Sequence, residues 1–282
     1  MRMTRQDVPG GPAETAGTMT AVTVDDRIDP ARAAALHAAL QWPGTAPGEA
    51  DPLPHFWHQI YFWDARPPTH LGVDGHVKPG AFIPDFGLQQ RMWAGGSLES
   101  EKPLIAGRAG RRISRIEEIA EKHGQSGPLK FVTVRHEIVQ DGLCAVERQQ
   151  LVYRNATRLR TASSGKAPSH CESFICDEVT LFRFSALTFN SHRIHYDADY
   201  CRQIAGYPAP VVHGPLLAMR LARLAVATGG EFRRFTYRAT GPAFCGERIL
   251  LWADTTDDRI ELSAGTADGR VCMTARAEGK QA

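Results

Sequence analysis

The sequence lacks a long apolar run and an excess of charge of one sign. No run of apolar residues approaches the roughly 20 that a membrane span needs, so we expect no membrane partner. The 33 lysines and arginines nearly balance the 31 aspartates and glutamates, and the net charge is +2. Because acids and bases are interspersed and leave no broad basic field, the composition also argues against a nucleic-acid partner.

Close cysteine pairs and a secretory leader are also lacking. The six cysteines (144, 171, 176, 201, 245 and 272) include no Cys-x-x-Cys pair. This scatter is typical of reduced, mostly buried thiols, with a Cys171–Cys176 pair as the alternative. Residues 1–7 contain two arginines, but no apolar stretch follows them, so a secretory signal is not expected. These features predict a cytoplasmic protein, and a weak mitochondrial presequence stays open.

The length and the local composition suggest two modules. A chain of 282 residues suffices for two modules of about 140 residues, each with its own core. Residues 1–22, rich in Gly, Pro, Thr and Ala, predict a flexible tail. We therefore divide the rest into a first module at 23–155, a linker at 156–178 without apolar periodicity, and a second module at 179–282.

Each module shows a helix followed by strands. Asp29 and Pro30 are suited to begin a helix that runs to about Leu40. From about residue 103 the pattern alternates, which predicts strands at 111–121, 129–139 and 143–153 and later at 235–240, 249–254, 259–264 and 270–276. Asp-Gly pairs at 141–142 and 268–269 predict hairpin turns. A helix and then strands, twice over, is an α+β plan in which a sheet wraps a central helix.

Two neighbouring motifs in the second module contain groups suited to chemistry. Residues 184–197 read FSALTFNSHRIHYD and place Asn190, His192 and His195 in a predicted loop, where functional side chains are commonly found. Residues 210–215 read PVVHGP, and Gly214 and Pro215 begin an apolar helix that ends at Gly229 and Gly230. The first N–H groups of such a helix have no intrahelical acceptor, so the Gly214 amide could polarise a substrate carbonyl.

The two motifs and their spacing resemble the second-half signature of MaoC-like hot-dog enoyl-thioester hydratases and hydroxyacyl-thioester dehydratases. In the better-known branch of that family the loop reads Asp, any residue, Asn, Pro, an aliphatic residue and His. His195 falls on the catalytic histidine, whereas Asn190 falls on the aspartate, and an amide cannot exchange a proton at neutral pH. The resemblance implies a double hot-dog fold, in which two antiparallel sheets each wrap a central helix.

Residues 184–190 are similar to the branch that contains two-module dehydratases and bacterial hydratases of branched dicarboxylic acyl-CoA esters. Residues 57–62, 91–96 and 127–136 resemble the first module of that branch. The resemblance implies a lyase that reversibly hydrates a short branched or dicarboxylic enoyl-CoA, of the mesaconyl-C4-CoA (3-methylfumaryl-CoA) or itaconyl-CoA type. Two alternatives stay open: a 3-hydroxyacyl carrier-protein dehydratase of fatty acid synthesis, and a non-catalytic acyl-thioester-binding protein.

In this interpretation three residues carry the chemistry. His195 accepts a proton from water, Gly214 stabilises negative charge on the thioester oxygen, and Asn190 either holds the water or caps its own turn. Candidates for substrate binding are Arg91, Trp93, His192, Arg193, His213 and Arg238, of which the three arginines could grip a substrate carboxylate.

We expect no metal and no cofactor besides the CoA that the substrate carries. His192, His195, Asp197 and Asp199 could form a metal set, but no H-E-x-x-H frame accompanies them. Asp197 more simply caps a short helix at 198–205. A carrier-protein partner would need a basic docking surface, for which the arginines at 108, 111, 112 and 115 are candidates. A homodimer is optional, because two modules in one chain already supply a pair.

Overall fold

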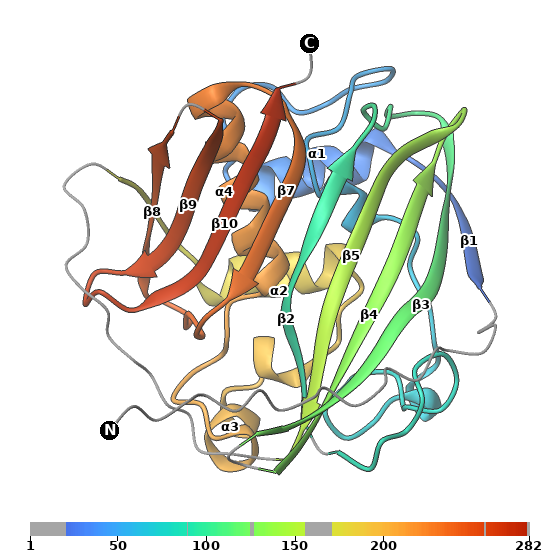
Figure 1. The fold of residues 1–282 in the computed structure, drawn as a ribbon, viewed down its shortest axis with the longest axis vertical. Helices are drawn as coiled ribbons and strands as arrows, with labels where there is room; N and C mark the ends of the chain where they lie inside the picture. The colour runs from blue at the N-terminus through green and yellow to red at the C-terminus, as the bar shows by residue number, and fades with distance from the viewer. Residues whose placement is uncertain (1–20, 89, 125–126, 156–170, 257, 281–282) are drawn as a thin grey trace, which may run out of the picture.

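The computed structural model describes residues 21–88, 90–124, 127–155, 171–256 and 258–280. Its main feature is a continuous antiparallel sheet of ten strands in the order β1-β3-β4-β5-β2-β7-β10-β9-β8-β6 (Figure 1). The first five strands of this order come from the first half of the chain and the last five from the second half. The halves therefore join edge to edge through β2 and β7, and the two predicted sheets form one.

Both halves have the same connectivity. The strands of the first half are β1 (Val22–Arg27), β2 (Gln90–Ser100), β3 (Ala109–Gly124), β4 (Gly127–Val139) and β5 (Leu143–Arg154). Those of the second half are β6 (Glu172–Ile175), β7 (Phe232–Ala239), β8 (Arg248–Thr255), β9 (Arg259–Thr266) and β10 (Val271–Lys280). Counted within its own half, each set has the order 1-3-4-5-2. This repeated α+β plan confirms the double hot-dog fold.

The helices are α1 (Pro30–Ala39), α2 (Glu178–Leu187), α3 (Ala198–Tyr200), which continues as a π turn at Cys201–Ala205, and α4 (Gly214–Gly229), besides short 3-10 turns at Trp57–Ile60, Pro68–His70 and Arg193–His195. Asp29 caps α1 as predicted, because its carboxylate accepts a hydrogen bond from Ala31 N–H at 2.9 Å. Asp197 likewise caps α3 through Tyr200 N–H at 2.8 Å. The predicted caps are confirmed at both positions.

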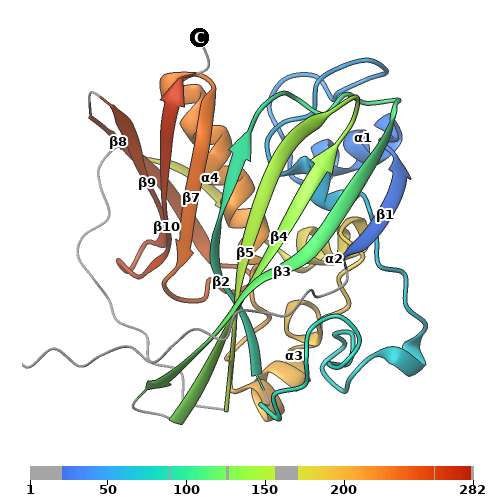
Figure 2. The ribbon, with the colours of Figure 1, turned by 45° about the vertical axis from the view of Figure 1, so that its right-hand side comes forward.

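The helical cover differs between the halves. α4 packs across β7, β8, β9 and β10 and buries an apolar face that includes Leu216, Leu217, Leu221 and Ala225. In the described part of the first half no helix of this length lies on β2 to β5, and α1 packs against α2 instead (Figure 2). A loop covers this sheet through four apolar side chains that pack on a small core of the sheet: Phe82, Ile83, Phe86 and Leu88. The expected central helix is therefore present in the second half and replaced by a loop in the first.

Several elements differ from the sequence prediction. β2 was not expected, since its Gly95-Gly96 pair disfavours a strand, yet a Cβ at Gly96 would lie 2.0 Å from the Arg148 carbonyl oxygen. α2 was also not expected, because four of its ten residues are β-branched or aromatic. Within the predicted linker, residues 156–170 lie outside the described residues, whereas Glu172–Ile175 form β6 and pair with β8. Of the predicted tail at 1–22, residues 1–20 also lie outside them, whereas Val22 begins β1.

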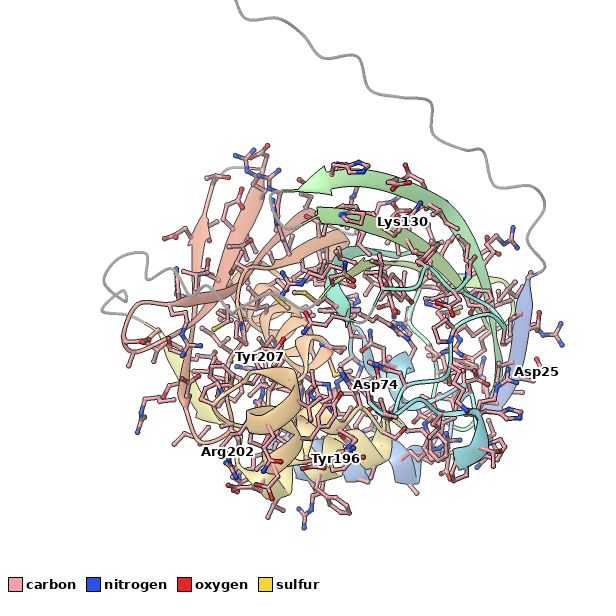
Figure 3. All side chains as sticks on the ribbon, turned by 90° about the horizontal axis from the view of Figure 1, so that it is seen from below. Asp25, Asp74, Lys130, Tyr196, Arg202 and Tyr207 are labelled. Atoms are coloured by element: carbon pink, nitrogen blue, oxygen red, sulfur yellow. The ribbon has the colours of Figure 1, made fainter. Side chains whose placement is uncertain are left out.

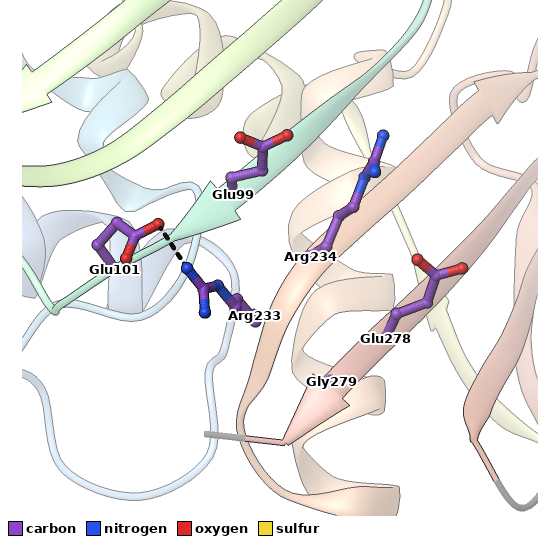
Figure 4. A pocket seen from close by; sticks show the side chains of 6 residues that line it. All are labelled: Glu99, Glu101, Arg233, Arg234, Glu278 and Gly279. Carbon is purple, nitrogen blue, oxygen red and sulfur yellow. Dashed lines mark hydrogen bonds and ion pairs between the residues drawn. The ribbon is translucent and has the colours of Figure 1, made fainter. Parts of the chain in front are cut away.

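The cysteines, the lengths of the helices and a surface groove bear on the predicted sites and partners. All six cysteines are free, so the alternative of a Cys171–Cys176 pair is wrong. Among the described residues, every helix is too short or too polar to cross a membrane. A surface groove of about 330 Å³ lies where β2 and β7 meet, and its lining consists of Glu99, Glu101, Arg233, Arg234, Glu278 and Gly279 (Figure 4). This groove contains no imidazole or thiol, and the histidines of the predicted site lie elsewhere.

Candidate active site

The candidate active site lies where a loop of the first half meets the loop between α2 and α3 and the start of α4. Residues 74–76 come from the first half, residues 190–197 from the second, and Trp93 reaches in from β2. Figure 3 shows Asp74, in its first-half loop, near the middle of the molecule and next to the second-half helices around Tyr196. Groups far apart in the sequence are thereby brought together.

His195 is buried and held in one orientation. Its Nδ1–H donates to the Val211 carbonyl oxygen at 2.7 Å, which assigns the tautomer and leaves Nε2 as the free base. Burial lowers the pKa of His195 to about 4, against the opposing effect of the Val211 carbonyl. The ring is therefore neutral at pH 7 and able to accept a proton. This agrees with the role that the sequence predicts.

His213 supports His195 from behind. The two rings stack with centroids 3.7 Å apart, and the Ser185 hydroxyl lies 2.8 Å from His213 Nε2. His213 is completely buried, and burial lowers its pKa well below the usual value. This burial favours a positioning role for His213, and its predicted binding role stays a prediction.

Asn190 shapes the loop. Its side-chain oxygen accepts a hydrogen bond from His192 N–H at 3.0 Å, and its own N–H donates to the Ser185 carbonyl at 2.8 Å. The turn-capping alternative is therefore confirmed. Water held by the same amide oxygen stays a prediction.

His192 meets two residues that the sequence analysis did not single out. The rings of His192 and His76 lie 3.8 Å apart, and His76 Nδ1 lies 3.1 Å from an Asp74 carboxylate oxygen. Burial and the neighbouring imidazoles lower the pKa of His192 to about 2. Asp74 and His76 stand in a short polar loop with no motif of their own, and only their spatial neighbours give them significance.

The grouping of possible metal ligands also differs from the expected one. Asp74, His76 and His192 offer ligand atoms that all lie within 4.8 Å of one another. Asp197 instead pairs with Arg193 at 2.6 Å, and Asp199 pairs with Arg202 at 2.8 Å. The set suggested by spacing is thus wrong in its carboxylates, while the prediction that the protein uses no metal is untested.

The first-half loop is fastened to the catalytic loop through main-chain groups. Arg193 N–H donates to the Asp74 carbonyl at 2.8 Å, and the Ser191 hydroxyl donates to the Gly75 carbonyl at 2.5 Å. Gly75 has φ +86°, and a Cβ there would lie 1.9 Å from the Ser191 carbonyl oxygen. Only glycine fits this position.

Gly214 occupies the first position of α4, as predicted, and Pro215 follows it. At this position the Gly214 N–H has no acceptor within the helix. A Cβ at Gly214 would lie 2.4 Å from the Trp93 ring, which itself stacks on Tyr237 with centroids 4.6 Å apart. Trp93 therefore contacts the α4 start and forms one wall of the site.

The three candidate arginines have different positions. Arg91 is partly buried and pairs across strands with Tyr153, which belongs to a small apolar core, and within the described residues Arg91 has no ion-pair partner. Its charge lowers the pKa of both His76 and His192, although burial is the larger cause in each case.

Arg193 is already paired with Asp197. Arg238 is exposed and follows inward-facing Tyr237, so it lies on the outer face of the sheet. These positions favour Arg91 over Arg193 and Arg238 as a substrate-binding group, and all three roles stay predictions.

Comparison with known proteins agrees with this arrangement. The model of the type 2 hydroxyacyl-thioester dehydratases matches residues 56–245. The chain is 41% identical over 262 residues to the mesaconyl-C(4)-CoA hydratase of Chloroflexus aurantiacus, which covers 90% of this chain and 94% of that protein. Its fold is similar to that of HtdX from Mycobacterium tuberculosis, with a TM-score of 0.65, 17% identity and coverage of 93% and 100% of the two chains. A second protein of that organism with a double hot-dog fold gives a TM-score of 0.54 at 11% identity over 95% and 97%.

Proposed function

The chain belongs to the type 2 hydroxyacyl-thioester dehydratases, a family of hydro-lyases that act on acyl thioesters, and we propose that it hydrates a short branched or dicarboxylic enoyl-CoA. Mesaconyl-C4-CoA is the first substrate to test, because the C. aurantiacus hydratase named for it shares 41% of its residues with this chain. The alternative of a non-catalytic binding protein is not retained, since the family consists of enzymes.

His195 Nε2 is the proposed base. It accepts a proton from a water molecule as the water oxygen adds to the β-carbon of the unsaturated thioester. Fixed by the Val211 carbonyl through Nδ1, the ring does not need to reorient during the transfer. Its pKa of about 4 keeps it neutral before the step.

The Gly214 N–H is the proposed donor to the thioester oxygen. Negative charge develops on this oxygen when the β-carbon is attacked, and the positive end of the α4 dipole lies at the same place. A donor aimed at developing charge contributes roughly 3 kcal/mol to lowering the barrier. Contact with Trp93 requires glycine at this position.

The proposal of a dicarboxylic substrate rests on the position of Arg91. Its guanidinium lies on the inner face of the sheet, next to Tyr153, and interacts electrostatically with His76 and His192. A partly buried cation with no ion-pair partner among the described residues favours an anion supplied by the ligand. The second carboxylate of a mesaconyl-type substrate is such an anion.

The proposed thioester carrier is CoA rather than a carrier protein. Three of the four arginines suggested as a docking surface are paired with acids: Arg108 with Asp141, Arg111 with Asp25, and Arg115 with Glu137. The fourth, Arg112, is largely buried, which lowers its pKa. An acidic carrier protein would have to compete with these internal pairs.

Turnover of mesaconyl-C4-CoA, itaconyl-CoA and crotonyl-CoA by the wild type, Arg91→Gln and Arg238→Gln tests the substrate class. Losing the guanidinium is expected to reduce kcat/KM for the dicarboxylic esters about a hundredfold, with less than about threefold change for crotonyl-CoA. Arg238→Gln, on the outer face, serves as the matched control and should leave all three rates unchanged. A preference for crotonyl-CoA in the wild type, or equal losses for all esters in Arg91→Gln, would contradict the dicarboxylic substrate and favour fatty-acyl chemistry.

A further inference from the structure

We propose that Asp74 and His76 of the first half form a second proton-transfer dyad, which serves the α-carbon while His195 serves the water. This proposal rests on the hydration reaction described above. It addresses the position where the better-known family motif has an aspartate and this chain has Asn190, whose amide cannot exchange a proton at neutral pH.

The dyad is oriented by two hydrogen bonds from one residue to the other. His76 N–H donates to one carboxylate oxygen of Asp74 at 3.1 Å, and its Nδ1 lies 3.1 Å from the other. With Nδ1–H donating to the carboxylate, Nε2 is the free atom of His76. Burial is the largest single effect and raises the pKa of Asp74, but the hydrogen bonds and charge of His76, together with the charge of His192, outweigh it and hold this pKa well below the usual range. Asp74 is therefore an anion that can stabilise an imidazolium on His76.

The position of the dyad is fixed relative to His195. The Asp74 carbonyl accepts from Arg193 N–H, two residues before His195, and Gly75 packs directly on Ser191. The His76 ring lies 3.8 Å from the His192 ring, which in turn lies 5.5 Å from the His195 ring. His192 thus stands between the two proposed proton-transfer groups.

The proposed step balances as follows. His195 Nε2 removes a proton from water, the water oxygen bonds to the β-carbon, and the double-bond electrons move to the α-carbon. Protonated His76 gives its Nε2 proton to that carbon, so the elements of one water molecule have been added. The proton on His195 then returns to His76 through His192 or through solvent, which restores the starting state.

The charge on Arg91 links this step to the substrate. Burial, with a smaller effect of Arg91, lowers the pKa of His76 below its usual value, because the hydrogen bond and charge of Asp74 oppose these effects without offsetting them. A substrate carboxylate that pairs with Arg91 neutralises one of the two lowering effects. Binding of a dicarboxylic ester therefore favours the protonated form of His76 that the step requires.

The test compares His76→Gln, Asp74→Asn and the matched control His70→Gln on whichever ester the wild type hydrates fastest, crotonyl-CoA included. His70 is exposed and lies in the same segment. Loss of the second proton-transfer group should lower kcat about a hundredfold in His76→Gln and about tenfold in Asp74→Asn, with KM changed less than threefold. His70→Gln should match the wild type.

Chemical rescue separates proton transfer from a structural role. In His76→Ala, added imidazole should restore part of kcat, and substituted imidazoles should restore it in the order of their basicity. Variants that stay within threefold of the wild type, or His76→Ala that no imidazole rescues, would overturn the dyad while leaving the proposed substrate intact. Activity that disappears with a chelator and returns with zinc would also overturn it, because Asp74, His76 and His192 would then be metal ligands.

Discussion

The two halves of the chain have the same strand order but bury different kinds of polar group. In the first half His58 and His136 are paired: His58 Nε2 lies 2.8 Å from Glu147, and His136 Nδ1 lies 2.8 Å from the Ser114 hydroxyl. In the second half a main-chain carbonyl holds His195 Nδ1 and leaves Nε2 free, and among the described residues His213 Nδ1 is buried without a partner, as is His37 Nε2 of the first half. A buried carboxylate or hydroxyl partner favours a stabilising role, whereas a histidine oriented by a carbonyl keeps a nitrogen that can serve chemistry.

The same contrast appears in the cover of the sheet. The second half contributes α4, whose start is the proposed donor to the thioester, whereas the first half contributes the loop that contains Asp74 and His76. A duplicated fold thus supplies one composite site rather than two equal ones. Trp93 of β2 stacks on Tyr237 of β7 where the two halves of the sheet join. Among the described residues, the indole N–H of Trp93 and the hydroxyl of Tyr237 are buried and have no hydrogen-bond partner.

The strongest way to break the comparison is to replace one histidine from each half. His195→Gln removes the base and should lower kcat/KM about a thousandfold with little change in the thermal midpoint. His136→Gln removes a buried imidazole that is hydrogen-bonded to Ser114 and Gln149, so it should lower the midpoint and leave kcat/KM within about threefold of the wild type. Thioester hydration assays and thermal unfolding check both variants. Equal activity losses would mean that the paired histidines also take part in the chemistry.

The contact between Gly214 of the second half and Trp93 of the first half gives the next largest expected effect on activity. In Gly214→Ala the new methyl group would lie 2.4 Å from the Trp93 ring, so the ring or the start of α4 must move. We expect about a hundredfold loss of kcat/KM through the displaced amide donor and a loss of about 1–3 kcal/mol in the free energy of unfolding. Gly241→Ala is the control, since its Cβ would meet nothing closer than 3.5 Å. If both variants behave alike, the close contact with Trp93 has no function.

The contact between the loop at residues 74–76 and the catalytic loop should have a smaller effect on activity, and Gly80 provides a matched control. Both Gly75 and Gly80 have positive φ, but only Gly75 meets the catalytic loop, whereas a Cβ at Gly80 would have nothing within 4 Å. Alanine at either position therefore has the same kind of conformational cost. Gly75→Ala alone should displace His76 and lower kcat about tenfold. An equal effect of Gly80→Ala would show that backbone strain, and not docking, is responsible.

Much of the second half could be predicted from the sequence, because its signals are local. The α4 boundaries follow from Pro215 and Gly230, and the hairpin turns follow from Asp-Gly pairs. β2 could not be predicted in this way, since its glycines reflect contacts with Arg148 and Tyr237 in neighbouring strands. Asp74 and His76 were missed for the same reason: their significance depends on a loop more than 100 residues further along the chain. Periodicity reports which face is buried but gives no information on which distant residues meet there.

The pH dependence of unfolding gives the smallest expected effect and the finest comparison of the halves. Burial lowers the pKa of both His195 and His136 to about 4, while an unfolded histidine has a pKa of about 6.5. The unfolded chain therefore binds more protons below pH 6.5, so the stabilising effect of neutral histidines is complete above that pH and is lost as the pH falls towards 4. Neutral His195 should set the acid limb of kcat/KM near pH 4 to 5, whereas the proposed protonated form of His76, whose pKa lies below its usual value, should add a fall in rate at higher pH. His136→Gln should weaken the pH dependence of unfolding without moving the acid limb, as rate profiles and unfolding curves at matched pH would show. An acid limb near pH 6.5 would instead mean that the active base is exposed to solvent, contrary to the burial of His195.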